Sequence, residues 1–183
     1  MIRKLFLFIL FTLPIFGQAT TKWWNDAVFY EIFVRSFYDG NGDGKGDFRG
    51  LINKLDYLND GNPTTTTDLG VTGIWLMPIN PSPSYHGYDV TDYRGIESDY
   101  GTMNDFKEFL TKAHQRGIKV IIDFVINHSS RQHPWFAAST DPSSPYRDYY
   151  IWKNFNPGYT GTWGQQVWHQ FNNYYYFGMF WSG

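Results

Sequence analysis

The chain has 183 residues, a formal net charge of -2 and no cysteine. The charge excludes the strongly basic surface that binds nucleic acids or anionic membranes, and the lack of cysteine excludes a disulfide framework. Aromatic residues make up 21% of the chain and charged residues 17%, which indicates a globular protein with aromatic-lined surfaces and is compatible with a neutral partner such as a sugar.

The N-terminal segment, residues 1–19, has the pattern of a secretory signal peptide. Arg3 and Lys4 precede an apolar run over residues 5–16, and residues 17–19 (Gly-Gln-Ala) place small side chains at the −3 and −1 positions of a signal peptidase site. The run has roughly 12 residues, whereas a membrane-spanning helix needs about 20. We therefore expect a secreted or periplasmic protein with no membrane partner after cleavage. An uncleaved membrane anchor is the alternative.

The first expected strand covers residues 27–37, which are rich in aromatic and β-branched side chains. Leucine and isoleucine then recur at helical spacing over residues 48–59, with Asp47 as a candidate N-cap and Gly61 just beyond the end. Residues 61–68 are polar and predict a surface loop. This order predicts a strand, a functional loop and a helix.

The loop over residues 39–47 carries an oxygen-bearing group at every second position, with glycines between them where the backbone must turn sharply. Three carboxylates that converge to about 4 Å repel by roughly 4 kcal/mol per pair at an effective dielectric near 20, so a compact loop needs a cation. Oxygen donors of this type suit Ca²⁺. The expected ligands are the side chains of Asp39, Asn41, Asp43 and Asp47 and the backbone carbonyl of Lys45.

The calcium prediction has one mismatch and one alternative. The EF-hand template has Glu at its twelfth position, where this chain has Gly50. The loop therefore begins like an EF-hand and then departs from it. A solvated Asp/Gly turn without any metal is the alternative.

Two further strands and one helix follow. Residues 71–79 predict a strand, residues 104–116 a helix that ends at Gly117, and residues 118–128 a strand that is buried on both faces because the run is nearly all apolar. Strands and helices in strict alternation predict right-handed βαβ units and a parallel sheet. The last strand ends in the polar residues Asp123, Asn127 and His128, where a parallel barrel collects its functional groups.

The pattern Asp-x-Val-x-Asn-His over residues 123–128 resembles the first conserved stretch of the α-amylase superfamily of glycoside hydrolases. The loop over residues 39–47 is similar to the calcium loop of oligo-1,6-glucosidase-like and neopullulanase-like members. The resemblance implies an α/β fold in which residues 20–128 are strands 1–3 of a (β/α)₈ TIM barrel. Residues 129–183, which show no clear period, would then be the incomplete inserted domain B.

The resemblance also implies roles for single residues. Tyr88 matches the tyrosine that stacks on the reacting sugar, and Asp89 and His128 match residues that hydrogen-bond it. Asp123 matches an aspartate that orients an arginine from a later strand, and Asn127 one that ligates a second calcium in many members. From the residues alone, a tyrosine beside a carboxylate suits a pyranose ring, while an Asx-turn and a structural histidine are the alternatives.

Aromatic residues in the last segment have two interpretations. They could form a platform for sugars or the small core of an irregular domain, and their density favours the core. The residues concerned are Trp163, Trp168, Tyr174, Tyr175, Tyr176 and Trp181.

Retaining glycoside hydrolysis needs two carboxyl groups about 5 to 5.5 Å apart. The family carries them after its fourth and fifth strands, and neither Glu97 nor Glu108 is a substitute, because one lies in a loop and the other in a helix. A complete barrel takes about 250 residues, and roughly 164 remain here without the signal. We therefore expect an N-terminal fragment, inactive alone, of a secreted retaining hydrolase of starch-like α-glucans or malto-oligosaccharides.

Two other functions stay open at this stage. One is a transglycosylase of the same family, and the other is a non-catalytic carbohydrate-binding or interaction protein on an amylase-like fold. Specificity for α-1,4 or α-1,6 bonds also stays open, because its determinants in the family lie largely after residue 183.

Overall fold

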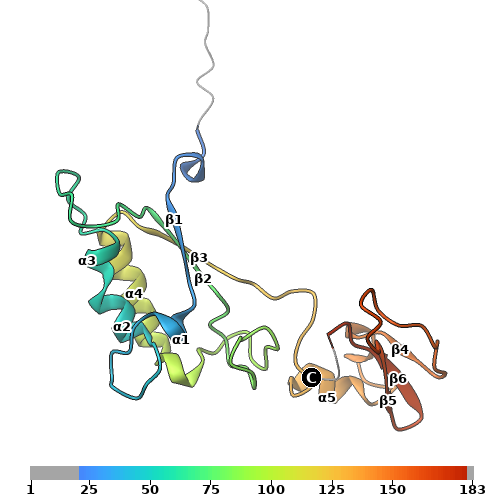
Figure 1. Ribbon diagram of the computed structural model, residues 1–183. Helices are drawn as coiled ribbons and strands as arrows, with labels where there is room; N and C mark the ends of the chain where they lie inside the picture. The colour runs from blue at the N-terminus through green and yellow to red at the C-terminus, as the bar shows by residue number, and fades with distance from the viewer. Residues whose placement is uncertain (1–20, 181–183) are drawn as a thin grey trace, which may run out of the picture.

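The computed structural model describes residues 21–180, so the predicted signal segment 1–19 lies outside the described residues. Two lobes lie side by side, joined by an extended stretch of chain (Figure 1). The first contains β1 (Phe29–Ile32), α1 (Val34–Phe37), α2 (Phe48–Asn53), α3 (Leu55–Leu58), β2 (Gly73–Leu76), α4 (Met103–Gln115) and β3 (Lys119–Ile122). The second contains α5 (Pro134–Ser139), β4 (Trp152–Lys153), β5 (Trp168–Phe171) and β6 (Tyr174–Phe177).

Three short 3-10 helices complete these elements: η1 (Trp23–Asn25), η2 (Ser98–Tyr100) and η3 (Arg147–Tyr149). Within residues 21–180, no helix has both the length and the apolar character that crossing a membrane requires.

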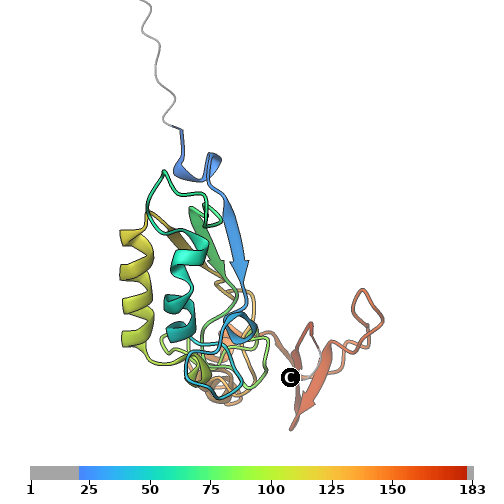
Figure 2. The same ribbon diagram turned by 60° about the vertical axis from the view of Figure 1, so that its left-hand side comes forward.

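β1, β2 and β3 form a parallel sheet with β2 in the centre. The register aligns Glu31 of β1 with Trp75 of β2, and Trp75 with Ile121 of β3. Helices α2 and α3 connect β1 to β2 and α4 connects β2 to β3, and all of them cover the same face of the sheet (Figure 2). This arrangement confirms the predicted βαβ alternation and the parallel sheet.

The hydrophobic core lies between the sheet and these helices. Phe48 of α2 is fully buried, and its ring centroid lies 5.2 Å from that of Phe106 and 5.8 Å from that of Phe109, both on α4. Ile74 and Leu76 of β2 face the same layer and are fully buried. Each such side chain contributes about 1.5–3 kcal/mol by leaving water. Packing against the helices therefore fixes which face of the sheet is covered.

Side-chain caps fix the N-terminal ends of α2 and α4. Asp47 is the N-cap of α2, as predicted, because its Oδ1 accepts a hydrogen bond of 2.6 Å from the backbone N–H of Gly50. Thr102 and Asp105 form a capping box at α4, which was not predicted. The predicted single helix over residues 48–59 is wrong, because the chain breaks at Lys54 into α2 and α3.

The first and second strands are shorter than predicted. The paired register between them ends at Ile32 and Leu76, and one further hydrogen bond runs from the Met77 N–H to the Ile32 carbonyl at 3.0 Å. The chain then turns into α1, where the Ser36 N–H bonds to the Phe33 carbonyl at 3.1 Å. The prediction of a strand up to residue 37 is therefore wrong, because local β-propensity does not form a strand where no neighbouring strand is present to pair with it.

The third strand departs most from its prediction. β3 ends at Ile122, and its side chains are not buried on both faces: Ile121 is 40% exposed, and Phe124 and Ile126, beyond the strand, are 69% and 76% exposed. β3 has β2 as its only strand neighbour among the described residues, and the helices cover one face alone. No helix of the described residues covers the other face of the sheet, the bare face.

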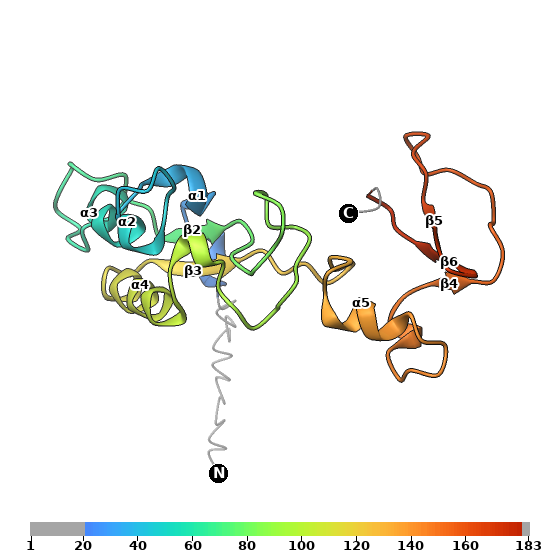
Figure 3. The same cartoon turned by 90° about the horizontal axis from the view of Figure 1, so that it is seen from below.

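The second lobe is more regular than predicted. β4, β6 and β5 form a small antiparallel sheet, seen apart from the first lobe in Figure 3. Phe136 of α5 packs against Tyr176 with ring centroids 5.0 Å apart, and Tyr176 and Trp168 are both buried. Trp163 is exposed, and Trp181 lies outside the described residues. Of the predicted aromatic set, Trp168 and Tyr176 therefore belong to a core.

Asp47→Ala should lower the free energy of unfolding by about 1–2 kcal/mol, because it removes the cap of α2. It also removes a second acceptor, since Asp47 Oδ2 accepts from the Gly40 N–H at 3.1 Å. Urea unfolding in the presence of a chelator measures this loss without any metal contribution. Asp47→Asn keeps one acceptor oxygen and should lose less; an equal loss in both variants would contradict the capping role.

Candidate functional site

The carboxylate of Asp123 gathers two side chains at the carboxyl end of the sheet. Its backbone N–H donates to the Leu76 carbonyl at 2.9 Å, which extends the pairing of β2 and β3 by one residue. Its Oδ1 accepts from Trp75 Nε1 at 2.8 Å, and its Oδ2 accepts from the hydroxyl of Tyr88 at 2.6 Å. The hydrogen bond to Asp123 raises the pKa of Tyr88 to about 12, so the phenol stays neutral.

His128 lies against the same loop. Its Nε2 is 3.1 Å from the backbone carbonyl of Tyr88, and a carbonyl only accepts, so Nε2 carries the proton. In the neutral ring Nδ1 is then a bare acceptor, and this atom is buried without a hydrogen-bond partner in the described part of the chain. The hydroxyl of Tyr93 donates to the His128 carbonyl at 2.8 Å and holds the backbone.

Asp89 is not part of this group. Its carboxylate accepts a hydrogen bond of 2.5 Å from Ser82 Oγ and another from Ser84 Oγ. The structure therefore brings together Tyr88, Asp123 and His128, and it turns Asp89 toward the start of its own loop. The predicted contact between Asp89 and the sugar stays a prediction, without support from its position.

A cavity of about 400 Å³ opens beside His128, between the end of β3 and the second lobe. Its wall is rich in aromatic side chains and includes Tyr93, Trp135, Tyr149 and Phe180. Asn127 lines the cavity with an exposed side chain, but none of the residues that line it is Asp or Glu. The second calcium at Asn127 stays a prediction, with no carboxylate in this wall to support it.

The sequence interpretation missed Trp75 and His86. Trp75 lies inside an apolar run, where a tryptophan is ordinarily assigned to a core, and only the register shows that it faces away from the helices. His86 Nδ1 accepts from the backbone N–H of Tyr88 at 3.1 Å. Its position two residues before Tyr88, within the segment Tyr-His-Gly-Tyr, was the available signal.

The loop over residues 39–47 is closed by its own acidic side chains. The carboxylate of Asp39 accepts backbone N–H groups from Gly42 at 2.6 Å, Gly44 at 2.8 Å and Asn41 at 3.1 Å. The hydrogen bond from Gly44, followed by those from Gly42 and Asn41, lowers the pKa of Asp39. Asp39 therefore stays ionised to lower pH than a free carboxyl group.

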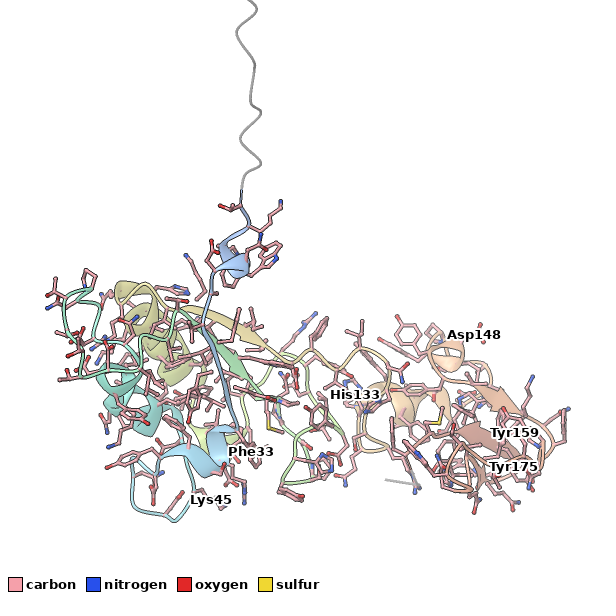
Figure 4. All side chains as sticks on the ribbon, turned by 45° about the horizontal axis from the view of Figure 1, so that its top comes forward. Phe33, Lys45, His133, Asp148, Tyr159 and Tyr175 are labelled. Atoms are coloured by element: carbon pink, nitrogen blue, oxygen red, sulfur yellow. The ribbon has the colours of Figure 1, made fainter. Side chains whose placement is uncertain are left out.

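Lys45 extends from this loop near the end of β1, where Figure 4 labels it close to Phe33. Its Nζ lies 2.7 Å from Asp99 Oδ1, and Arg35 Nη1 lies 2.6 Å from Asp99 Oδ2. Asp99 belongs to η2, in the loop that also carries Tyr88. The ammonium group of Lys45 thus pairs with a residue outside the loop. No described ion pair includes Asp39, Asp43 or Asp47.

The donor set of this loop fits calcium in chemical type, because all five predicted donors are oxygens. Gly50 explains the departure from the EF-hand: a Cβ there would clash with the carbonyl of Tyr38, so no glutamate fits. The described residues contain no gathered group of three or more His, Cys, Asp or Glu side chains that could hold a metal. The fit of this loop to calcium therefore rests on its oxygen donors and on carboxylate charges that no described ion pair compensates.

Known proteins resemble this chain over most of its length. The model of the alpha amylase catalytic domain matches residues 31–183. Alpha-amylase 3 of Dictyoglomus thermophilum is 47% identical over 180 residues, which is 97% of this chain and 34% of the relative. An oligo-1,6-glucosidase of Parageobacillus thermoglucosidasius is 51% identical over 141 residues, which is 76% of this chain and 23% of the relative.

A solved structure gives the same result for the fold. The crystal structure of alpha-amylase from H. orenii superposes with a TM-score of 0.80 at 61% sequence identity, covering 86% of this chain and 33% of that chain. The chain therefore spans about a quarter to a third of the length of these proteins.

Asp99→Asn should lower the free energy of unfolding at pH 7 by about 1 kcal/mol, because it weakens two partly exposed ion pairs. Hydrogen bonds from Lys45 and then Arg35 lower the pKa of Asp99 in the folded state. The stabilisation is thus present above the unfolded value, near 3.9, and is lost as pH falls through the folded pKa. Urea unfolding at pH 7 and at a pH low enough to protonate Asp99 in the folded state measures both limits. Asp26→Asn, exposed and outside the described ion pairs, is the control; an equal loss at both pH values would contradict the charge origin.

Proposed function

This chain belongs to the alpha-amylase catalytic-domain family, and we propose that it provides the sugar-binding edge of the first three barrel strands in an enzyme that hydrolyses α-glucosidic bonds. The observation that carries this proposal is the convergence of Tyr88, Asp123 and His128 at the carboxyl end of a parallel sheet. That edge is where (β/α)₈ enzymes place their active sites. The substrate class proposed is starch-like α-glucans or malto-oligosaccharides.

The chain's own residues bind and orient in this proposal. Tyr88 is 37% exposed, and its ring offers a flat apolar surface to a pyranose while its hydroxyl is held by Asp123. His128 is fixed by its Nε2 contact, and its Nδ1 gains from a hydroxyl donor because an unpaired buried acceptor costs about 1–3 kcal/mol. The imidazole of His128 would have to rotate for its buried Nδ1 to reach such a hydroxyl.

The bond-breaking carboxyl groups are proposed to come from outside residues 1–183. Glu108 pairs with Arg49 and Lys112 on the helical side of the sheet, away from Asp123. Glu97 accepts from the backbone N–H of Ser82 and caps η2. Both carboxylates are thus committed to structural contacts, which supports the sequence interpretation that neither acts as nucleophile or acid/base.

His128→Ala in the full-length enzyme should lower kcat/KM for malto-oligosaccharides about 100-fold, because the imidazole is proposed to contact the sugar in the transition state. His114→Ala is the matched control, since His114 is exposed on α4. Unchanged kcat/KM in His128→Ala would contradict the role of His128. A wild-type enzyme without any turnover of α-glucosides would contradict the function itself, and product analysis at high substrate concentration separates hydrolysis from transglycosylation.

Calcium is proposed as the ligand of the loop over residues 39–47, with Asp39, Asn41, Asp43, Asp47 and the carbonyl of Lys45 as its donors. Bound there, the ion would neutralise carboxylates that no described ion pair compensates and would stabilise the fold. No chemical step is assigned to it.

Removal of calcium by a chelator should lower Tm by several degrees, because a ligand at about 100 times its Kd adds roughly 2.7 kcal/mol of stability. Added Ca²⁺ should restore the original Tm. Asp43→Asn removes one charge but no helix cap, so the shift should shrink in this variant. A Tm that responds to neither chelator nor Ca²⁺ would exclude the site.

A further inference from the structure

Trp75 lies on β2, the central strand of the parallel sheet. Its side chain stands on the bare face of the sheet, in register with Glu31 on one side and Ile121 on the other, and it is 39% exposed. Its one polar atom, Nε1, donates to Asp123 Oδ1 at 2.8 Å.

Asp123 is held at three points. Its backbone is fixed to β2 through the Leu76 carbonyl at 2.9 Å, and each carboxylate oxygen has its own donor, Trp75 Nε1 for Oδ1 and the hydroxyl of Tyr88 for Oδ2. A carboxylate with donors on both oxygens cannot rotate about its terminal torsion without breaking one bond. The indole of Trp75 and the hydroxyl of Tyr88 therefore bond to the two oxygens of one carboxylate.

We propose that Trp75 is a positioning residue that, through Asp123, holds the ring of Tyr88 in place for a sugar. Tyr88 belongs to the loop between β2 and η2, and its only described side-chain hydrogen bond is the one to Asp123. Ordering this side chain before binding avoids an entropy cost on binding. The proposal rests on the proposed function of Tyr88 as the surface on which the sugar stacks.

The ionisation of Tyr88 reports on the network without any substrate. Asp123 is the largest cause of the raised pKa of Tyr88, through the hydrogen bond that it accepts. If Trp75 holds the carboxylate in place, removal of its N–H weakens that bond and the pKa of Tyr88 falls. If Trp75 merely disperses the negative charge of Asp123, its removal leaves the pKa of Tyr88 unchanged or higher.

The first test is NMR of protein labelled at tyrosine ¹³Cζ, with the Tyr88 signal assigned by its absence in Tyr88→Phe. In the wild type this signal should not titrate below about pH 11, and in Asp123→Asn it should titrate at lower pH, closer to the ordinary value of about 10. Trp75→Phe, which keeps an aromatic ring, should lie between them. Trp24→Phe, another exposed tryptophan, should match the wild type. A Trp75→Phe titration at or above that of the wild type overturns the proposal.

The second test is a double-mutant cycle on kcat/KM in the full-length enzyme. Trp75→Phe should lower kcat/KM about tenfold, mainly through KM, and should have no further effect in the Tyr88→Phe background, which lacks the hydroxyl. Additive losses overturn the positioning role while the proposed function stands. The pKa of Tyr88 could fall in Trp75→Phe while the full-length protein turns over no α-glucoside. That pair of results would support the hydrogen-bond network and reject the proposed function.

Discussion

Pairing of the three parallel strands determines which side chains meet at the functional edge. The Met77 N–H donates to the Ile32 carbonyl at 3.0 Å and the Asp123 N–H to the Leu76 carbonyl at 2.9 Å, so the strands end in one row. Residues that are far apart in the sequence leave the sheet at the same edge, and the loop after β2 folds back across it. Asp123 meets Tyr88 because of this alignment, although 34 residues lie between them in the chain.

The same pairing explains why one face of the sheet is bare. Both crossovers carry their helices to one side, as right-handed connections require, and this side holds the core. The other side presents Phe29, Trp75 and Ile121, each close to 40% exposed. In a closed barrel this is the interior, where side chains from alternate strands pack in layers. A family member represented by three strands must therefore expose apolar side chains on this face.

Local signals in the sequence were sufficient where one residue controls one feature. Asp47 and Gly117 were recognised because a cap and a left-handed turn depend on the residue at a single position, and Gly117 has φ of +75°. Strand ends could not be predicted in this way, because β1 and β3 stop where their neighbours stop. The break at Lys54 had no visible signal. In the second lobe, four consecutive aromatic residues obscured the alternation that a strand pattern needs.

Tyr88 and Asp89 illustrate what a motif can specify. They are adjacent, and the resemblance assigned a sugar contact to both, yet one side chain bonds to Asp123 and the other to Ser82 and Ser84. The carboxylate of Asp89 closes its loop from one side, while Asp123 holds the Tyr88 hydroxyl from the other. The Tyr88 hydroxyl is therefore held by an aspartate that is distant in the sequence, whereas the adjacent aspartate bonds within its own loop.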